Sequence, residues 1–261
     1  MKPDRGTTAA ARPDLVDALD DLLGHDAFAE LSSTASAQPA IYCASLALWS
    51  TRGDLEPRCF AGHSLGEITA LAAAGWIDEI EGLRLVARRG ALMEKACAIH
   101  PGGMIAILGV GAFSALPFAE KYGLVLANEN APDQAVVAGP SEALDKLADQ
   151  LDQQRVSFIR LPVSGAFHSA LMAPAVDPFR EELDRVKLMP NDRVVFSAAT
   201  LAPFTRVDEL AKGLIRPVRW RQALLALWEA GARTFTAFGP GRTLEALVRR
   251  NLPNADVWAV P

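Results

Sequence analysis

The chain has 261 residues, of which 50% are hydrophobic and 22% charged, and its formal net charge is -5. These values are typical of a globular protein with one substantial core, and the acidic balance argues against nucleic acid as the main partner. No apolar run approaches the roughly 20 residues of a membrane-spanning helix, so we expect no membrane partner. Three widely spaced cysteines (Cys43, Cys59, Cys97) and a polar start without a secretory signal predict a cytoplasmic location and no metal cluster.

The first hundred residues predict mainly helices. Residues 1–12 lack periodicity and predict a flexible lead-in, whereas leucines along one stripe predict a helix over about 13–24. The later elements of this part are a buried helix over 40–49, a short strand over 58–61 stopped by Gly62, a helix from Leu65 and a helix over 79–97.

The stretch over 103–163 has a different order of elements. Strands are predicted over 103–110, 123–130, 134–139 and 155–163, with helices over 113–122 and 142–154. This β-α-β-β-α-β order is that of a ferredoxin-like α+β unit. We therefore predict a small subdomain over 103–163, inserted between the two halves of a larger subdomain that comprises 1–102 and 164–261.

The rest of the chain alternates again between helix and strand. A helix is predicted over 169–187, a strand over 193–198, a helix over 217–230, a strand over 233–238 and a last helix after the Gly-Pro-Gly turn. Such alternation favours a central parallel sheet covered by helices on both faces, so the expected fold class is α/β.

Residues Gly62-His63-Ser64-Leu65-Gly66 match the G-x-S-x-G nucleophile elbow, which adds an α/β-hydrolase-like character to the large subdomain. In this motif both glycines are expected to let a strand turn sharply into a helix, so that the serine hydroxyl is exposed on a strained corner. The helix start behind it, including the Leu65 amide, can donate to a developing oxyanion. A tight glycine turn that contains serine by coincidence is the alternative.

A nucleophilic Ser64 requires a base, and the chain has only four histidines. His63 adjoins the serine and should point away from its hydroxyl, while His25 and His100 lie in predicted surface loops. His168 follows a strand-like segment and precedes a helix, which places it at the edge of the sheet. By elimination His168 is the predicted base; no acidic residue is clearly placed to orient it, and a backbone carbonyl could do so instead.

Positive charge is concentrated near the end of the chain. The segment 212–250 holds eight basic and two acidic residues and is therefore +6 inside an acidic protein. It is either a solvated helix face or a docking surface for a phosphorylated or acidic partner.

Several sequence blocks in the same order as here characterise one family. GHSLGE (62–67), RLVARRGALM (84–93), GAFHSALM (165–172), RPVRW (216–220) and FGPGRTLEAL (238–247) resemble the successive blocks of malonyl-CoA:acyl carrier protein transacylases and polyketide-synthase acyltransferase domains. AQPAIYCASLALW (37–49) resembles the block that precedes the elbow in that family. The resemblance runs from about residue 13 to the end of the chain.

The resemblance implies an [acyl-carrier-protein] S-malonyltransferase of fatty-acid or polyketide biosynthesis. By position, Ser64 is similar to the acylated nucleophile, His168 to its base and Arg89 to the arginine that binds the malonyl carboxylate, for which a planar guanidinium is well suited. Phe167 resembles the aromatic residue of malonyl-selective members, where bulk excludes a substituent on the α-carbon. The histidine-orienting carbonyl would fall near Gly213. The family's pocket blocks also contain Gln38 and Asn130, which are weaker candidates.

The chain departs from the family at its start. Members open with a strand and a Gly-Gln-Gly-Ser-Gln-like loop that supplies the second oxyanion donor, and neither is found here. We expect the large subdomain to lack this first strand, either because the chain is truncated or because it is a natural variant. Loss of one oxyanion donor typically costs about 10²–10³ in rate.

The implied reaction uses malonyl-CoA and an acyl carrier protein, which could dock on the 212–250 segment, and it needs no metal or redox cofactor. Three alternatives stay open: an editing acyl hydrolase, a transferase of longer acyl groups between carrier proteins, and a docking module without catalysis. The carboxylate-binding Arg89 favours malonyl transfer over the editing hydrolase, because simple acyl chains offer no carboxylate.

Overall fold

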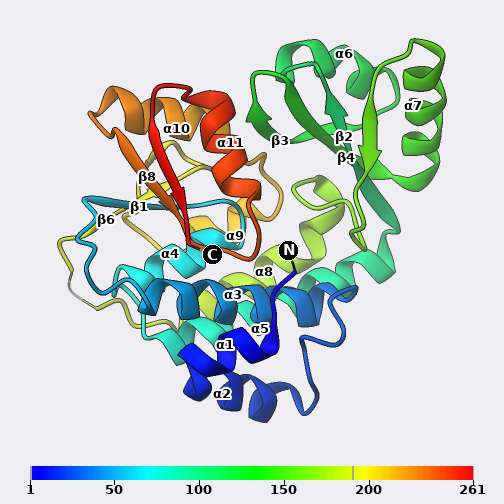
Figure 1. Cartoon of the computed structure of the whole chain (residues 1–261). Coiled ribbons are helices and arrows are strands. Elements are labelled where there is room, and N and C mark those ends of the chain that lie inside the picture. Colours follow the sequence, from blue (N-terminus) through cyan, green and yellow to red (C-terminus); the bar gives the residue numbers. More distant parts are fainter. Residues whose placement is uncertain (1, 190, 261) are drawn as a thin grey trace.

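The computed structural model of the chain describes residues 2–189 and 191–260. It has a large part built on helices and short strands, and a second lobe formed by an antiparallel sheet with two helices (Figure 1). No helix among the described residues is long and apolar enough to cross a membrane.

The large part begins with helices and contains two short parallel strand pairs. Its elements are α1 (Arg5–Ala11), α2 (Pro13–Leu23), α3 (Thr34–Ser50), β1 (Cys59–Gly62), α4 (Gly66–Ala73), α5 (Glu79–Ile99), the 3-10 turn η1 (Ala170–Met172), α8 (Ala173–Leu183), β6 (Val194–Ser197), β7 (Ala202–Pro203), α9 (Glu209–Gly213), α10 (Trp220–Glu229), β8 (Thr234–Ala237), α11 (Thr243–Asn251) and β9 (Asp256–Ala259). One buried apolar cluster joins α3, α4, α5 and α8. It contains Leu46, Leu71, Leu83 and Phe179, one from each helix.

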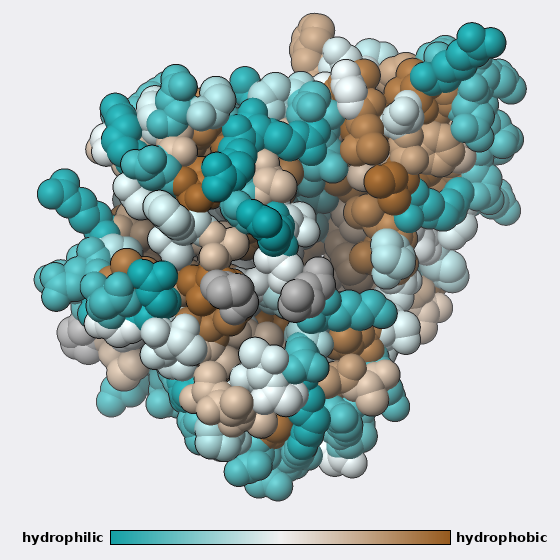
Figure 2. Space-filling view, viewed as in Figure 1, coloured by the Kyte–Doolittle hydropathy of each residue, from teal (hydrophilic) through white to brown (hydrophobic). Residues whose placement is uncertain are grey.

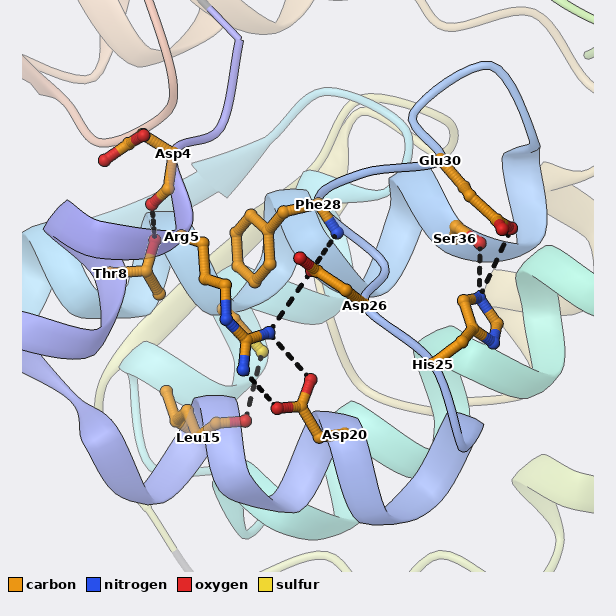
Figure 3. A network of polar contacts seen from close by, with 11 residues as sticks. Asp4, Arg5, Thr8, Leu15, Asp20, His25, Asp26, Phe28, Glu30 and Ser36 are labelled. Carbon is orange, nitrogen blue, oxygen red and sulfur yellow. Dashed lines mark hydrogen bonds and ion pairs between the residues drawn. The ribbon is translucent and has the colours of Figure 1, made fainter.

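The prediction of a flexible lead-in over 1–12 is wrong for its described residues, because α1 is a capped and anchored helix. The Asp4 side chain accepts a hydrogen bond of 2.8 Å from the Thr7 amide and so caps the first turn. Arg5 reaches across to Asp20 on α2 and to Asp26 in the following turn (Figure 3). These partners are 15 and 21 residues away in sequence, so the local sequence around Arg5 does not predict the contacts.

The central sheet consists of two separate pieces in this structure, rather than one continuous parallel sheet. β1 pairs in parallel with β6, which pairs antiparallel with β7, and β8 pairs in parallel with β9. Among the described residues the other edges of β1 and β8 have no strand partner. Trp49 of α3 contacts both pieces of the sheet. Its ring packs edge-on against Phe60 of β1 and against Phe238, just after β8, with ring centroids 5.4 Å and 5.2 Å apart.

The second lobe has the predicted ferredoxin-like topology. Its elements are β2 (Gly102–Leu108), α6 (Ala112–Lys121), β3 (Val125–Ala131), β4 (Gln134–Pro140), α7 (Ser141–Gln153) and β5 (Phe158–Arg160), with the strand order β3-β4-β2-β5. Alternate residues of β2 face opposite sides: Ile105 and Ile107 pack under α6 and α7, whereas Met104 and Ala106 pack toward Ala166. Figure 2 shows hydrophilic residues over α7 and apolar ones over the sheet.

Several predicted elements differ in length. The predicted strand over 155–163 is reduced to β5, because only Phe158–Arg160 pair with β2. The predicted helix over 169–187 starts as the η1 turn, where the Ser169 hydroxyl accepts from the Leu171 amide at 3.2 Å, and α8 ends at Leu183. The short elements β7, α9 and β9 were not predicted. The subdomain boundaries at 103 and 163 stay a prediction.

Candidate active site

Ser64 occupies a sharp corner between β1 and α4. Its φ angle of 56° lies in the left-handed region, which costs energy for a residue with a side chain and is a known feature of strained functional turns. A Cβ atom at Gly62 would lie 1.9 Å from the carbonyl carbon of Gly66, so only glycine fits there. A Cβ at Gly66 would meet no atom within 4 Å. The expectation that both glycines are sterically required is therefore wrong; Gly62 alone is.

We expect the two glycines of the elbow to respond differently to alanine. Gly62→Ala should displace the start of α4, lower the melting temperature and prevent labelling of Ser64 by a fluorophosphonate probe, because the added carbon overlaps backbone atoms. Gly66→Ala should leave stability nearly unchanged, since the added carbon faces open space. Thermal unfolding and probe labelling of both variants measure this; equal effects would contradict the steric explanation.

His168 is placed to act on Ser64. Its Nε2 lies 2.8 Å from the Ser64 Oγ, and its Nδ1 lies 2.9 Å from the carbonyl oxygen of Gly213 and 3.0 Å from that of Arg216. Because carbonyls only accept hydrogen bonds, Nδ1 carries the proton and Nε2 is free to accept one from the serine. Gly213 was predicted for this role; Arg216 was missed, since any residue type offers a carbonyl.

The His168 imidazole is buried, and burial lowers its pKa to about 3, with the positive charge of Arg89 acting in the same direction. The hydrogen bonds to the carbonyls of Gly213 and Arg216 oppose this shift. Burial also lowers the pKa of Arg89 to about 10, which leaves its guanidinium charged at neutral pH. The site thus holds a neutral base next to a fixed positive charge.

This lowered pKa predicts the pH dependence of acylation. A base with a pKa of about 3 is neutral from about pH 5 upward, so kcat/KM for acylation should show no acidic limb near pH 6.5. In the unfolded chain His168 protonates below about pH 6.5 but in the folded chain only near 3, so its contribution to stability falls as the pH falls through that window. Rapid-quench acylation between pH 5 and 8 measures this, and a midpoint near 6.5 would contradict it.

The side chain of Arg89, in α5, also contacts the Ser64 hydroxyl. It is 5% exposed, and one guanidinium nitrogen donates to the Ser64 Oγ at 3.1 Å while the other donates to the Gln38 Oε1 at 2.5 Å. The Gln38 amide nitrogen donates in turn to the Thr34 hydroxyl at 2.9 Å. Gln38 therefore orients Arg89, and the guanidinium stands beside the serine.

The pocket around these groups contains residues that sequence reasoning did not single out. It is lined by Ser64, Glu67, Arg89, His168, Ala199, Leu210, Gly213, Arg216 and Val218. Glu67 is the most informative addition, because it is 5% exposed and burial raises its pKa. Its position in an otherwise apolar helix, right after the elbow, is a usable signal, since a carboxylate is rarely buried without a partner.

The remaining predicted residues lie near this pocket without lining it. The Oδ1 of Asn130 in β3 accepts a 2.9 Å hydrogen bond from the Nε2 of His63. Phe167 is half-buried and packs between two apolar clusters, close to Cys97 and Gly165. The Leu65 amide has no acceptor among residues 2–189 and 191–260, so it is free to donate to a substrate oxygen.

Comparison with known proteins identifies the family. The acyl transferase domain family matches residues 9–259. A malonyl CoA-acyl carrier protein transacylase of Mycobacterium tuberculosis is 37% identical over 244 residues, 88% of this chain and 79% of that protein. The polyketide biosynthesis protein ThaF of Burkholderia thailandensis is 35% identical over 92% of this chain, which spans only 22% of ThaF.

Solved structures agree with the sequence comparison. The crystal structure of MCAT from Mycobacterium tuberculosis has a TM-score of 0.89 at 32% identity and covers 99% of this chain and 94% of that one. The crystal structure of a malonyl CoA-acyl carrier protein transacylase from Clostridium perfringens also has a TM-score of 0.89, at 26% identity, and the match covers 100% of this chain and 89% of that one. The expected fold class, an α/β subdomain with a ferredoxin-like one, is thereby confirmed. This chain belongs to the acyl transferase domain family, with transacylases of this kind among its relatives.

Proposed function

We propose that this protein transfers a malonyl group from malonyl-CoA, through an ester on Ser64, to the phosphopantetheine thiol of an acyl carrier protein. The observation that carries the proposal is the buried guanidinium of Arg89, 3.1 Å from the Ser64 Oγ. A buried positive charge next to a nucleophile suits an acyl group that carries its own negative charge. It would be a costly neighbour for a simple fatty acyl chain.

In the first half-reaction Arg89 binds the malonyl carboxylate and His168 Nε2 takes the Ser64 proton as Oγ attacks the thioester carbon. The imidazolium that forms is stabilised by the carbonyls of Gly213 and Arg216, which accept hydrogen bonds from its Nδ1–H. The Leu65 amide donates to the oxyanion. Collapse of the intermediate breaks the C–S bond, and the proton on His168 passes to the departing coenzyme A thiolate.

In the second half-reaction the carrier thiol takes the place of coenzyme A. His168 removes the thiol proton, and the sulfur attacks the carbonyl carbon of the Ser64 ester. The bond between that carbon and Oγ then breaks, and His168 returns the proton to Oγ. The carboxylate held by Arg89 fixes the acyl group between the two steps. The proposed cycle uses groups of the chain and of the two thiol substrates, without a metal or redox cofactor.

Intact mass measurement tests the proposal directly. Incubation with malonyl-CoA should add the mass of one malonyl group to the protein, and later addition of a phosphopantetheinylated carrier protein should move that mass to the carrier. Free malonate without malonyl carrier would instead indicate an acyl hydrolase. Absence of any adduct on Ser64 would contradict catalysis altogether and support a docking role.

We propose that the carrier protein docks near the basic 212–250 segment, although fewer of its charges are available than the sequence suggested. Arg242 and Arg249 pair with Glu245, and Arg250 with Asp133. Exposed Lys212 and Arg216, next to the pocket, are the better candidates for an acidic partner. We also propose a cytoplasmic location, in line with the three free cysteines among the described residues.

Phe167 is the proposed determinant of malonyl selectivity. Phe167→Ala should raise the ratio of kcat/KM for methylmalonyl-CoA to that for malonyl-CoA by about 10-fold, because steric discrimination of one methyl group is worth about 1–3 kcal/mol. Competition between the two thioesters, read by intact mass, measures this ratio. An unchanged ratio would mean that Phe167 serves only the apolar packing in which the structure places it.

A further inference from the structure

The orientation of His168 depends on a backbone segment rather than on a side chain. Both carbonyls that orient its Nδ1 belong to residues 213–216: Gly213 is the last residue of α9, and Arg216 lies three residues further on. A carbonyl moves with its backbone, so the imidazole is only as well placed as the segment 213–219. What anchors this segment therefore bears on the reaction.

One end of this segment is tied to the lobe formed by the antiparallel sheet. The Val218 amide donates to the Ala127 carbonyl at 2.9 Å, and the Val218 carbonyl accepts from the Glu129 amide at 2.9 Å. Val218 is also 4% exposed. These are backbone bonds, which any residue type could make.

The other tie uses a side chain. The Arg219 amide donates to the Ala198 carbonyl at 3.0 Å, and the Arg219 guanidinium donates to the Ala199 carbonyl at 2.6 Å. Arg219 is thus bound to Ala198 and Ala199, in the turn 197–199 at the end of β6. This turn lies at the pocket, since Ala199 is one of its lining residues.

The 197–199 turn is held in turn by Glu67, from the first helical turn behind the elbow. The Glu67 Oε1 accepts from the Ser197 hydroxyl at 2.8 Å and from the Ala198 amide at 2.9 Å. Ser197 and Ala198 are each 1% exposed, so these bonds are shielded from water. Glu67 follows Ser64 by three residues, and the chain of contacts therefore runs from the nucleophile's helix back to the base.

We propose that Glu67 and Arg219 are positioning residues of the transfer reaction: acting through the 197–199 turn, they fix the 213–219 segment whose carbonyls orient His168. The proposal rests on the proposed function for its assignment of His168 as the base. Although Glu67 lines the pocket, neither side chain takes a proton or an acyl group in this scheme. Both set the distance and direction of the imidazole relative to the Ser64 hydroxyl.

The test compares Glu67→Ala, Glu67→Gln, Arg219→Ala and the double alanine variant. Each alanine variant should lower the acylation rate by about 10²-fold, the size expected for a small misplacement of a catalytic group. KM for malonyl-CoA should not rise, because the hydrogen bonds that orient Arg89, through Gln38 to Thr34, involve neither Glu67 nor Arg219. Glu67→Gln keeps an acceptor oxygen for Ser197 and Ala198 and should recover most of the lost rate. The double variant should lose little more than either single one, since both act on one turn.

Arg233→Ala is the matched control. Arg233 also donates to backbone carbonyls, those of Trp228 and Ala232, but at the far end of α10. It should lower the melting temperature without changing the acylation rate. The amplitude of fluorophosphonate labelling gives the folded fraction of every variant, and the labelling rate reports the reactivity of Ser64 without requiring malonyl-CoA.

The outcomes separate the two proposals. Wild-type labelling of Ser64 without any malonyl adduct would overturn the proposed function, while slow labelling of the alanine variants would still support the positioning role. Wild-type rates in Glu67→Ala and Arg219→Ala would overturn the positioning role alone. Rates that fall only in proportion to the labelled fraction, or that fall equally in Arg233→Ala, would also overturn it.

Discussion

Ser64→Ala should form no acyl adduct with malonyl-CoA, and His168→Ala should form it only very slowly. The serine oxygen is the only atom placed to accept the acyl group, and His168 Nε2, at 2.8 Å, is the only base in reach of it among the described residues. Removal of either member of a Ser–His pair from a serine protease costs about 10⁶-fold in kcat, and a loss of that order is expected here.

The double variant is the internal control for this prediction. Because the two residues act as one unit, the residual rate of malonyl-carrier formation should be no lower in Ser64→Ala with His168→Ala than in either single variant. Single-turnover mass measurements give the rates, and thermal unfolding checks that the variants fold. An adduct on Ser64→Ala at the wild-type rate would place the nucleophile elsewhere and contradict the site.

Arg89 should determine which acyl group is accepted. Arg89→Leu should lower kcat/KM for malonyl-CoA by about 10²–10³, because a paired guanidinium contributes two charge-assisted hydrogen bonds of roughly 1.5–3 kcal/mol each and part of that is regained by water. Acetyl-CoA has no carboxylate, so its kcat/KM should not fall in the same way. The expected result is a change in selectivity rather than a general loss.

Arg89→Lys separates the charge of Arg89 from its shape. Lysine keeps the charge but lacks the planar fork, so it should recover only part of the malonyl rate. The same variants also test a competing role, since Arg89 donates to the Ser64 Oγ at 3.1 Å. If malonyl-CoA and acetyl-CoA fall equally in Arg89→Leu, the guanidinium orients the serine instead of binding the carboxylate.

Local patterns predicted the elements that depend on neighbours in sequence. The G-x-S-x-G spacing predicted the corner at Ser64. The spacing of apolar residues, which differs between helices and strands, predicted the order of strands and helices in the second lobe. Both signals act within a few residues of the chain. Elimination among four histidines was enough to propose His168. Arg89 required the family resemblance, since nothing in its local sequence distinguishes it from Arg88.

Tertiary structure alone decided the rest, because the contacts concerned join residues far apart in the chain. Helix α1 is anchored by the hydrogen bonds from Arg5 to Asp20 and Asp26. The central sheet is divided because β1 pairs with β6 and β8 pairs with β9, with no pairing between the two groups of strands among the described residues. The carbonyl of Arg216 has no residue-type signature, and nothing in the local sequence of Glu67 indicates that its partner is Ser197, 130 residues later. The sequence by itself determined which groups could react; the folded backbone determined their distances and directions, since these depend on where distant segments pack.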